Sequence, residues 1–293
     1  MDDDETGFFS TARIAILGLG LMGGSLAMAL RGQCAAVFGI DRDLQTLELA
    51  RQRQLVDRVS TEPAELLPAA DVIILATPVN TILENLQTLP EQHPGPAIVL
   101  DLGSTKAQIV AAMQQLPERF DPLGGHPMCG KEVSGLANAD PRLFQEAAFA
   151  FTPLARTSPR ARGFAKELAG ILGAHPLWLN PQAHDRWVAA TSHLPYLVSN
   201  ALAFSTPAEA APLAGSGYRS ATRLAQTSPA MMLDVLMTNR ENILAASGRF
   251  RAHLDLLDEL LRRGDFEALR SFLKSGAERQ IAMFQTIEHG EIQ

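Results

Sequence analysis

The feature that most limits what this chain can fold into is a set of glycines at the end of an apolar stretch, in residues 13–25 (RIAILGLGLMGGS). The order is that of a buried strand, a glycine turn and a helix start. Gly18 allows the tight turn, Gly20 lets the backbone approach a pyrophosphate, and Gly23 lets the helix pack closely against the sheet. The helix N-terminus then offers unpaired N–H groups and a positive dipole end to phosphates. The stretch therefore predicts a dinucleotide-binding α/β unit.

An acidic residue follows the next apolar run, residues 36–40 (AVFGI). It comes about one βαβ span after the glycine turn, where a carboxylate can bind a ribose diol. Asp41 also repels the 2′-phosphate of NADP, whereas Arg42 next to it can bind that phosphate. We therefore expect NAD as the preferred cofactor, with NADP as the alternative. The residues expected to bind it are Gly18, Gly20, Leu21, Met22, Gly23, Asp41, Arg42, Thr77, Pro78 and Ser104.

The composition argues against several classes of protein. The 293 residues suffice for two domains of about 150 residues each, and 46% hydrophobic with 19% charged residues is typical of a globular protein. A net charge of −7 without a basic stripe argues against a nucleic-acid partner. No apolar run reaches the about 18 residues of a membrane span, and residues 1–5 (MDDDE) do not resemble a signal peptide. Cys34 and Cys129 form neither a disulfide framework nor a metal-ligand spacing, so we expect a reduced, cytoplasmic protein without a metal site.

Strand and helix patterns alternate in the first half of the chain. Short apolar runs are separated by segments of helical spacing, such as 44–54 and 79–89. The alternation predicts a doubly wound parallel sheet with helices on both faces, whose ligands bind beyond the carboxyl ends of the strands. The expected strands are 14–17, 37–40, 72–76, 98–100 and 149–152.

The pattern changes near residue 158, after which only one short strand-like piece remains, at 175–179. We expect a dinucleotide-binding Rossmann domain in residues 1–158 and an all-helical domain in residues 159–293. Long apolar helices in so small a domain leave surface to cover, which predicts a homodimer through the helices. The expected helices are 181–205, 229–249, 252–263 and 266–285, with Gly264 and Asp265 between the last two.

The main candidate for acid–base chemistry is His126, in the segment 124–130 (GGHPMCG). Glycines before it and a proline after it predict a rigid loop at the cofactor edge of the sheet. A neutral imidazole there can take a proton from a hydroxyl; a structural loop histidine is the alternative. Ser104, at the end of a neighbouring strand, can bind the His126 ring or the nicotinamide amide, and it can also cap the helix that begins near Lys106.

A second group of polar side chains lies in the helical half. His193 stands two residues before Pro195, which removes a helix hydrogen bond, so His193 is either a pocket wall or a histidine packed between helices. Arg219 and Arg223 are four residues apart and share a face if their segment is helical. Arginine suits two-point recognition of a carboxylate, and its apolar neighbours predict that Arg223 points inward. We interpret His184 as structural.

The motifs GLGLMGGS, GSTK, GGHPMCGKE, SHLP and GYRSATR, in this order across most of the chain, resemble those of the prephenate/arogenate dehydrogenases of tyrosine biosynthesis. The resemblance implies an NAD(P)-dependent oxidative decarboxylation of a cyclohexadienyl substrate and a dimer built from the helical domains. By motif, it implies that His126 is the catalytic histidine that hydrogen-bonds the ring 4-hydroxyl. Ser104 would be its partner near the nicotinamide, and Arg223 would pair with the ring carboxylate.

Departures from the family motifs surround the side chain that distinguishes prephenate from arogenate. Tyr196 stands where many relatives have a second histidine, Ser220 where some have an acid, and Lys131 where a small polar residue is common. The Tyr196 hydroxyl can accept a hydrogen bond from the ammonium group of arogenate, and Glu132 can add a negative charge that Lys131 partly opposes. The balance favours arogenate slightly, with prephenate as a second substrate. The residues expected to bind substrate are Arg223, His193, Tyr196, Lys131 and Glu132.

Two other functions compete with this interpretation. The β-hydroxyacid dehydrogenases share a GLGxMG start and a helical second domain, but they use a helix lysine as acid and base. The helix expected at 181–205 contains no lysine. A dinucleotide-binding redox sensor without catalysis would have no reason to combine His126, Ser104 and Arg223 around the nicotinamide. An assay for tyrosine formation separates the three functions.

Overall fold

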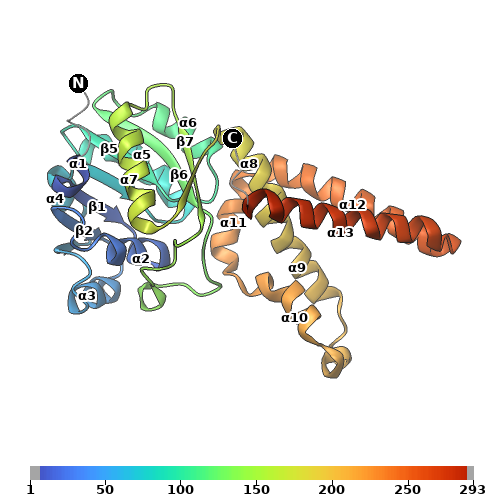
Figure 1. Cartoon of the computed structure of the whole chain (residues 1–293). Coiled ribbons are helices and arrows are strands. Elements are labelled where there is room, and N and C mark those ends of the chain that lie inside the picture. The colour runs from blue at the N-terminus through green and yellow to red at the C-terminus, as the bar shows by residue number, and fades with distance from the viewer. Residues whose placement is uncertain (1–6, 289–293) are drawn as a thin grey trace. The chain divides into compact units, whose positions relative to one another are not determined.

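The computed structural model describes residues 7–288, so the acidic residues 1–5 lie outside the described part of the chain. The chain divides into two units, Met1–Arg240 and Glu241–Gln293. The first unit is built on a sheet that has eight strands within the described residues, in the order β3-β2-β1-β4-β5-β6-β7-β8 (Figure 1). The strands are β1 (Arg13–Leu17), β2 (Ala36–Ile40), β3 (Arg58–Ser60), β4 (Val72–Leu75), β5 (Ala97–Asp101), β6 (Phe120–Pro127), β7 (Ala148–Pro153) and β8 (His175–Trp178).

The expected Rossmann-type fold is confirmed, but the sheet is mixed instead of wholly parallel. Strands β1 to β6 run parallel, with β1 between β2 and β4. Strand β7 then pairs with β6 in the antiparallel sense, and β8 lies parallel to β7. A parallel neighbour needs a crossover, usually through an α-helix, whereas residues 128–147 contain only the short 3₁₀ turn Leu136–Asn138. The chain therefore returns in the opposite direction.

Helices cover both faces of this sheet. Alternate residues of β1 point into two separate clusters of buried apolar side chains, one on each face. Helices α2 (Leu21–Leu30) and α7 (Pro159–Leu172) pack into the first cluster, and α5 (Val79–Gln92) and α6 (Ala107–Gln114) pack into the second. The other α-helices in this part of the chain are α1 (Phe8–Thr11), α3 (Leu44–Gln52) and α4 (Pro63–Leu66).

The sheet continues past residue 158, where we expected the first domain to end. Ser158 caps α7 by accepting a hydrogen bond from the Ala161 N–H, and α7 buries its apolar face in the same core as α2. Strand β8 then extends the sheet by one more strand. The helical region begins with α8 (Pro181–Val188), so the segment from Pro159 to Trp178 belongs with the sheet.

The helix expected at 181–205 is interrupted where proline predicts a disturbance. Helix α8 leads into a π-helical turn at Ala189–His193, and α9 (Leu194–Ser205) follows. Pro195 has no N–H to offer a carbonyl of the preceding turn, so the wider turn stands next to it. Two further helices, α10 (Ser216–Thr222) and α11 (Pro229–Thr238), belong to the same unit.

The prediction of a single helix over residues 229–249 is wrong. Helix α11 ends at Thr238, and α12 (Arg240–Arg263) runs without a break through the interruption that we placed near residue 250. Asn239 separates the two helices, with φ −124° and ψ 23°. Its buried side chain donates hydrogen bonds to the Asp185 carbonyl and to His193 Nδ1. This use of the amide in tertiary contacts explains why the chain leaves the helix there.

The second unit is a hairpin of α12 and α13 (Phe266–Glu288), with the rings of His253 and Phe272 5.9 Å apart between them. Gly264 joins the helices at φ +67°, as the sequence predicts. Large apolar side chains are exposed on the hairpin: Leu244, Leu254, Leu256, Leu261, Phe266, Leu273, Ile281, Met283 and Phe284. No helix in residues 7–288 combines the length and the apolarity that crossing a membrane requires.

Candidate active site

The glycine turn between β1 and α2 has the shape that its sequence predicts. Gly18 adopts φ +94°, and a Cβ there would come within 2.8 Å of Thr77 Cγ2 and 2.9 Å of the Ala76 carbonyl oxygen. A Cβ on Gly23 would overlap the Gly18 carbonyl oxygen. Among the described residues, no atom lies within 4 Å of the place where a Cβ of Gly20 would be. The turn is therefore closed on the sheet side and open where a pyrophosphate would lie, so its residues fit a dinucleotide.

The other residues expected to bind the dinucleotide stand around this turn. Asp41 follows β2, and its carboxylate accepts hydrogen bonds from the N–H groups of Leu19, at 2.7 Å, and Asp43, at 3.0 Å. Thr77 and Pro78 lie between β4 and α5, with Thr77 against the turn. Because β1 is flanked by β2 and β4, this is the point where the strand order reverses, at which doubly wound sheets bind ligands. Leu21 and Met22 begin α2, and Arg42 is exposed.

His126 lies in strand β6 and not in the loop that we expected. Gly124 and Gly125 are also strand residues, and a Cβ on Gly125 would come within 2.7 Å of the Asp101 carbonyl oxygen. The glycines therefore let β6 approach the end of β5 closely. His126 Nδ1 is 2.9 Å from His184 Nε2, and the two rings meet edge to face at 65°. The strand gives His126 a fixed backbone, and a neighbouring ring fixes its side chain.

Behind His126, the chain of contacts continues into the interior. His184 Nδ1 is 2.8 Å from Asp185 Oδ1, and both side chains are 1% exposed. The Asp185 carboxylate also accepts hydrogen bonds from the N–H groups of Lys106 and Ala107, at the start of α6. Asp185 therefore satisfies the N-terminus of the helix for which a Ser104 cap was the alternative role. His184 and Asp185 were missed as site residues; the only local signal was a His-Asp pair in a helical pattern.

A buried ion pair supports the strand that carries His126. The Lys106 ammonium is paired with Asp101, and both side chains are fully buried. Lys106 Nζ also donates to the Gly125 carbonyl at 2.6 Å, while Asp101 accepts the N–H groups of Gly103 and Gly125. Burial lowers the pKa of Lys106 and raises that of Asp101, and their mutual attraction opposes both shifts. The pair ties the end of β5 to β6 one residue before His126.

The three histidines of the site are held neutral by their surroundings. Burial lowers the pKa of His126 well below its ordinary value, and nearby His184, Lys106 and His193 act in the same direction. Burial also lowers the pKa of His184, against the effect of Asp185, and brings the pKa of His193 to about 4. A neutral imidazole has a free lone pair near pH 7, so His126 can act as a base.

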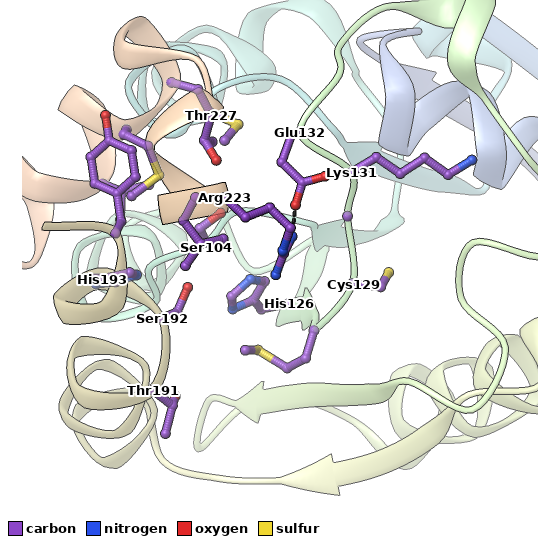
Figure 2. Close-up of a pocket in the computed structure, with 17 residues that line it drawn as sticks. Ser104, His126, Cys129, Lys131, Glu132, Thr191, Ser192, His193, Arg223 and Thr227 are labelled. Carbon is purple, nitrogen blue, oxygen red and sulfur yellow. Dashed lines mark ion pairs between the residues drawn. The ribbon is translucent and has the colours of Figure 1, made fainter. Parts of the chain in front are cut away.

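A pocket of about 420 Å³ opens in front of His126 (Figure 2). It contains every residue that we expected to act on substrate, brought together from β6 and its following loop, the end of β5, the π-helical turn, α9 and the segment after α10. The lining residues are Ser104, His126, Met128, Cys129, Gly130, Lys131, Glu132, Thr191, Ser192, His193, Tyr196, Arg223, Leu224, Thr227, Met231, Met232 and Val235.

The charged residues of the pocket differ in where they point. Arg223 is ion-paired with Glu132 across the pocket, although 59% of its side chain remains exposed (Figure 2). Lys131 extends away from His126 and is 3.5 Å from Asp140. Arg223 lines the pocket, whereas Arg219 is not among the lining residues.

Helix α11 joins the pocket wall to the dinucleotide side of the first unit. Asp234 accepts hydrogen bonds from the N–H and the side-chain amide of Asn80, at 3.2 and 2.7 Å. The hydroxyls of Thr105 and Thr238 are 2.8 Å apart. These contacts reach the two segments that follow β4 and β5, which hold Thr77 and Ser104. The helical wall of the pocket is therefore bonded to the loops that flank the glycine turn.

Comparisons with known proteins identify the family. Residues 26–177 match the model of the prephenate dehydrogenase nucleotide-binding domain, and residues 180–275 match that of its dimerization domain. A prephenate dehydrogenase of Bacillus subtilis is 34% identical over 275 residues, covering 89% of this chain and 73% of that protein. The crystal structure of prephenate dehydrogenase from A. aeolicus with hydroxyphenyl propionate and NAD+ superimposes with a TM-score of 0.86 at 28% identity, covering 94% of this chain and 99% of that one.

A crystal structure of Synechocystis arogenate dehydrogenase is also similar, with a TM-score of 0.79 and 32% identity over 92% of this chain and 99% of that one. Both domains of the family are thus matched in order, and the matched relatives span both substrate names. The chain belongs to the prephenate/arogenate dehydrogenase family, the nicotinamide-dependent oxidoreductases of tyrosine biosynthesis.

Proposed function

We propose that this enzyme oxidises and decarboxylates a cyclohexadienyl substrate in the pocket, with His126 as the base. The observation that carries this assignment is an imidazole that borders the pocket and is held from behind by His184. A bound nicotinamide supplies the acceptor for the hydride that leaves the hydroxyl-bearing ring carbon. His126 Nε2 takes the hydroxyl proton as the ketone forms.

The same proton completes the reaction. When the bond between the ring and its carboxylate breaks, carbon dioxide leaves and the bond electrons move through the ring to the oxygen. The phenolate that results takes the proton back from His126, so no proton needs to leave the site. The pocket has to position the reacting carbon and manage this one proton, and aromatisation provides the driving force.

Two lining residues suit the substrate's anionic and carbonyl groups. Arg223 can bind a ring carboxylate at two points, in exchange for its contact with Glu132. The Asn239 atom that donates to the Asp185 carbonyl is the amide nitrogen Nδ2. An amide nitrogen cannot accept, so Nδ2 is also the donor in its hydrogen bond with His193 Nδ1. The proton of the neutral His193 ring therefore lies on Nε2. His193 Nε2 is buried and has no partner among the described residues. We infer that it donates to a carboxylate or carbonyl oxygen of the substrate.

The preference between the two substrates is proposed from the charges. Glu132 is the acidic residue among those that line the pocket, and Lys131, which would oppose it, is turned toward Asp140. A carboxylate in this place favours the ammonium group of arogenate over the keto group of prephenate. Tyr196 is buried, lines the same pocket and offers a hydroxyl in place of a histidine. We propose arogenate as the preferred substrate and prephenate as the second.

Steady-state kinetics with both compounds test the function and the preference together. We expect tyrosine or 4-hydroxyphenylpyruvate to form with reduction of the dinucleotide, and a higher kcat/KM for arogenate. Glu132→Gln should lower kcat/KM for arogenate more than for prephenate, whereas Lys131→Gln, the neighbouring control, should leave the ratio unchanged. An equal or higher kcat/KM for prephenate in the wild-type enzyme would contradict the preference, and no turnover of either compound would contradict the function.

The proposed cofactor is NAD. Asp41 is held beside the glycine turn by the Leu19 N–H. A carboxylate after the second strand supports NAD, because it would repel the 2′-phosphate of NADP. Arg42 is exposed and can bind that phosphate, so we propose NADP as a weaker alternative. Ser104 lies at the pocket and next to Thr105, and we propose that it contacts the nicotinamide or the substrate hydroxyl. Measurement of kcat/KM with both cofactors checks the preference; a higher value for NADP would refute it.

We propose a homodimer through the helical region, with the boundary between the two domains near Leu179. Support comes from the family's dimerization domain and from the exposed apolar side chains of α12 and α13. Leu273, which is 57% exposed, is a suitable probe. Leu273→Glu should shift the mass in solution from a dimer toward the 31.6 kDa monomer, measured by light scattering. A wild-type monomer would contradict the proposal.

A further inference from the structure

A continuous series of side chains leads from the interior of the protein to the His126 ring. Asp185 Oδ1 is 2.8 Å from His184 Nδ1, and His184 Nε2 is 2.9 Å from His126 Nδ1. His184 and Asp185 are 1% exposed and do not line the pocket, whereas His126 does. The ring nitrogen of His126 that does not face His184 is therefore the one available to the pocket.

The direction of every hydrogen bond in this series follows from its buried end. The Asp185 carboxylate has no proton to donate, and it already accepts two backbone N–H groups at the start of α6. His184 Nδ1 must therefore carry the proton that it shares with Asp185. A neutral imidazole has one N–H, so His184 Nε2 is an acceptor, and His126 Nδ1 has to donate to it. This leaves His126 Nε2 without a proton.

We propose that His184 and Asp185 are positioning residues that set the tautomer of His126, so that its bare Nε2 faces the pocket. This inference rests on the proposed role of His126 as the base. When Nε2 takes the substrate proton, the imidazolium keeps its Nδ1–H bond to His184, whose own dipole is oriented by Asp185. The series therefore keeps the His126 ring in one orientation while the proton is taken up and returned. No proton has to travel beyond His126.

Two substitutions of His184 distinguish its role as a hydrogen-bond acceptor from a role in packing alone. His184→Phe keeps an aromatic ring but removes the acceptor, so kcat should fall by about 10²-fold or more, as expected for a base held in the wrong tautomer. His184→Gln places an amide oxygen where it can accept the same bond, so kcat should stay much closer to the wild-type value. KM and the affinity for NAD should change little in either variant, because His184 is buried and does not line the pocket.

Ring nitrogen NMR of the free enzyme gives a readout that does not depend on turnover. Protonated and bare imidazole nitrogens differ strongly in chemical shift, so the wild-type spectrum should show His126 with Nδ1 protonated and Nε2 bare. The spectrum of the Phe variant should show a mixture of tautomers or the opposite one. His93→Gln serves as the control, since His93 is another buried histidine with both ring nitrogens bonded, to the Gly95 and Ala70 carbonyls. Its kcat should not change.

The possible failures are distinguishable. A wild-type His126 with a protonated Nε2, or a His184→Phe variant with wild-type kcat, overturns the inference while the proposed function stands. If His126→Asn keeps wild-type turnover, the proposed function itself fails. Should the Phe variant not fold, the Gln variant and the wild-type spectrum still decide. A His184→Gln variant as inactive as a His126 variant would also overturn the inference. That result would mean that residue 184 has to take up a proton itself, which the glutamine amide cannot do.

Discussion

The dinucleotide edge and the substrate side of the site recognise their ligands by different means. At the dinucleotide edge, the backbone of one short segment does most of the work, and Gly18, Gly20 and Gly23 lie within six residues of one another. On the substrate side, side chains of β6 and α8 and the N–H groups at the start of α6 meet across 58 to 79 residues of sequence. The dinucleotide edge depends on glycines that have no side chain, whereas the substrate side depends on a network of side chains that must all be present. Substitutions should therefore fail in different ways on the two sides.

The largest effect is expected on the substrate side, for His126→Asn. Loss of a general base typically costs about 10²–10⁴-fold in rate, so kcat should fall by that amount. Folding and NAD affinity should remain, because His126 lies on β6, three strands along the sheet from β1 and its glycine turn. Thermal unfolding, NAD titration and kcat on the purified variant make the comparison. A kcat near that of the wild type would remove His126 from the reaction.

Gly23→Ala should break the dinucleotide edge by a steric route. Its Cβ would overlap the Gly18 carbonyl oxygen, and overpacking of this kind costs about 1–3 kcal/mol. We expect NAD affinity and the unfolding temperature to fall together. Gly20→Ala is the matched control, because its Cβ meets no described atom: it should keep the unfolding temperature and weaken NAD binding alone. Equal stability losses in both variants would mean that the turn is not closed as described.

Arg223→Ala tests whether substrate and cofactor are bound independently. A charge-assisted hydrogen bond contributes about 1.5–3 kcal/mol, so KM should rise by about tenfold or more for a substrate with a ring carboxylate. The Kd for NAD should stay constant. Initial rates over a range of substrate concentrations, together with an NAD titration, provide both numbers. Weaker NAD binding with an unchanged KM would assign Arg223 to the dinucleotide edge instead of the substrate side.

The pH dependence should report the neutral histidines of the substrate side. The groups that face His126 are His184, Lys106 and His193, and together with burial they lower its pKa. A base with a lowered pKa stays unprotonated as the pH falls below its ordinary value of about 6.5. We expect kcat/KM to hold through pH 6.5 and to decline only at lower pH. An acid limb centred at or above pH 6.5 would show that His126 is not held neutral.

The smallest effect is expected for Tyr196→His, which concerns selectivity and not catalysis. A histidine adds a donor suited to the keto acid, so the ratio of kcat/KM for arogenate to that for prephenate should fall. Both individual kcat values should stay within the same order of magnitude, since the proposed base is His126 and not Tyr196. Kinetics with both substrates measure the ratio. An unchanged ratio would assign the discrimination to another residue.

The two sides of the site also differ in how well the sequence predicts them. The glycine turn, the acid after β2 and the motifs that line the pocket were all found, because a local pattern carries each of them. His184 was interpreted as structural and Asp185 was not considered, since only the fold brings Asp185 to the start of α6. The extent of β6, the strand that carries His126, was missed because two glycines and two prolines conceal its pattern.

Asp185 makes the order of folding matter for activity. Its carboxylate accepts N–H groups at the start of α6, and its carbonyl accepts a hydrogen bond from the Asn239 side chain. It is also the buried end of the series of side chains that runs through His184 to His126. These bonds span 54 to 79 residues of sequence, so they form only after the sheet and the helical region have joined. Until then His126 has no defined tautomer, even on a finished strand. A newly made chain should therefore bind dinucleotide before it can turn over substrate, and recovery of activity on refolding should lag behind recovery of NAD binding.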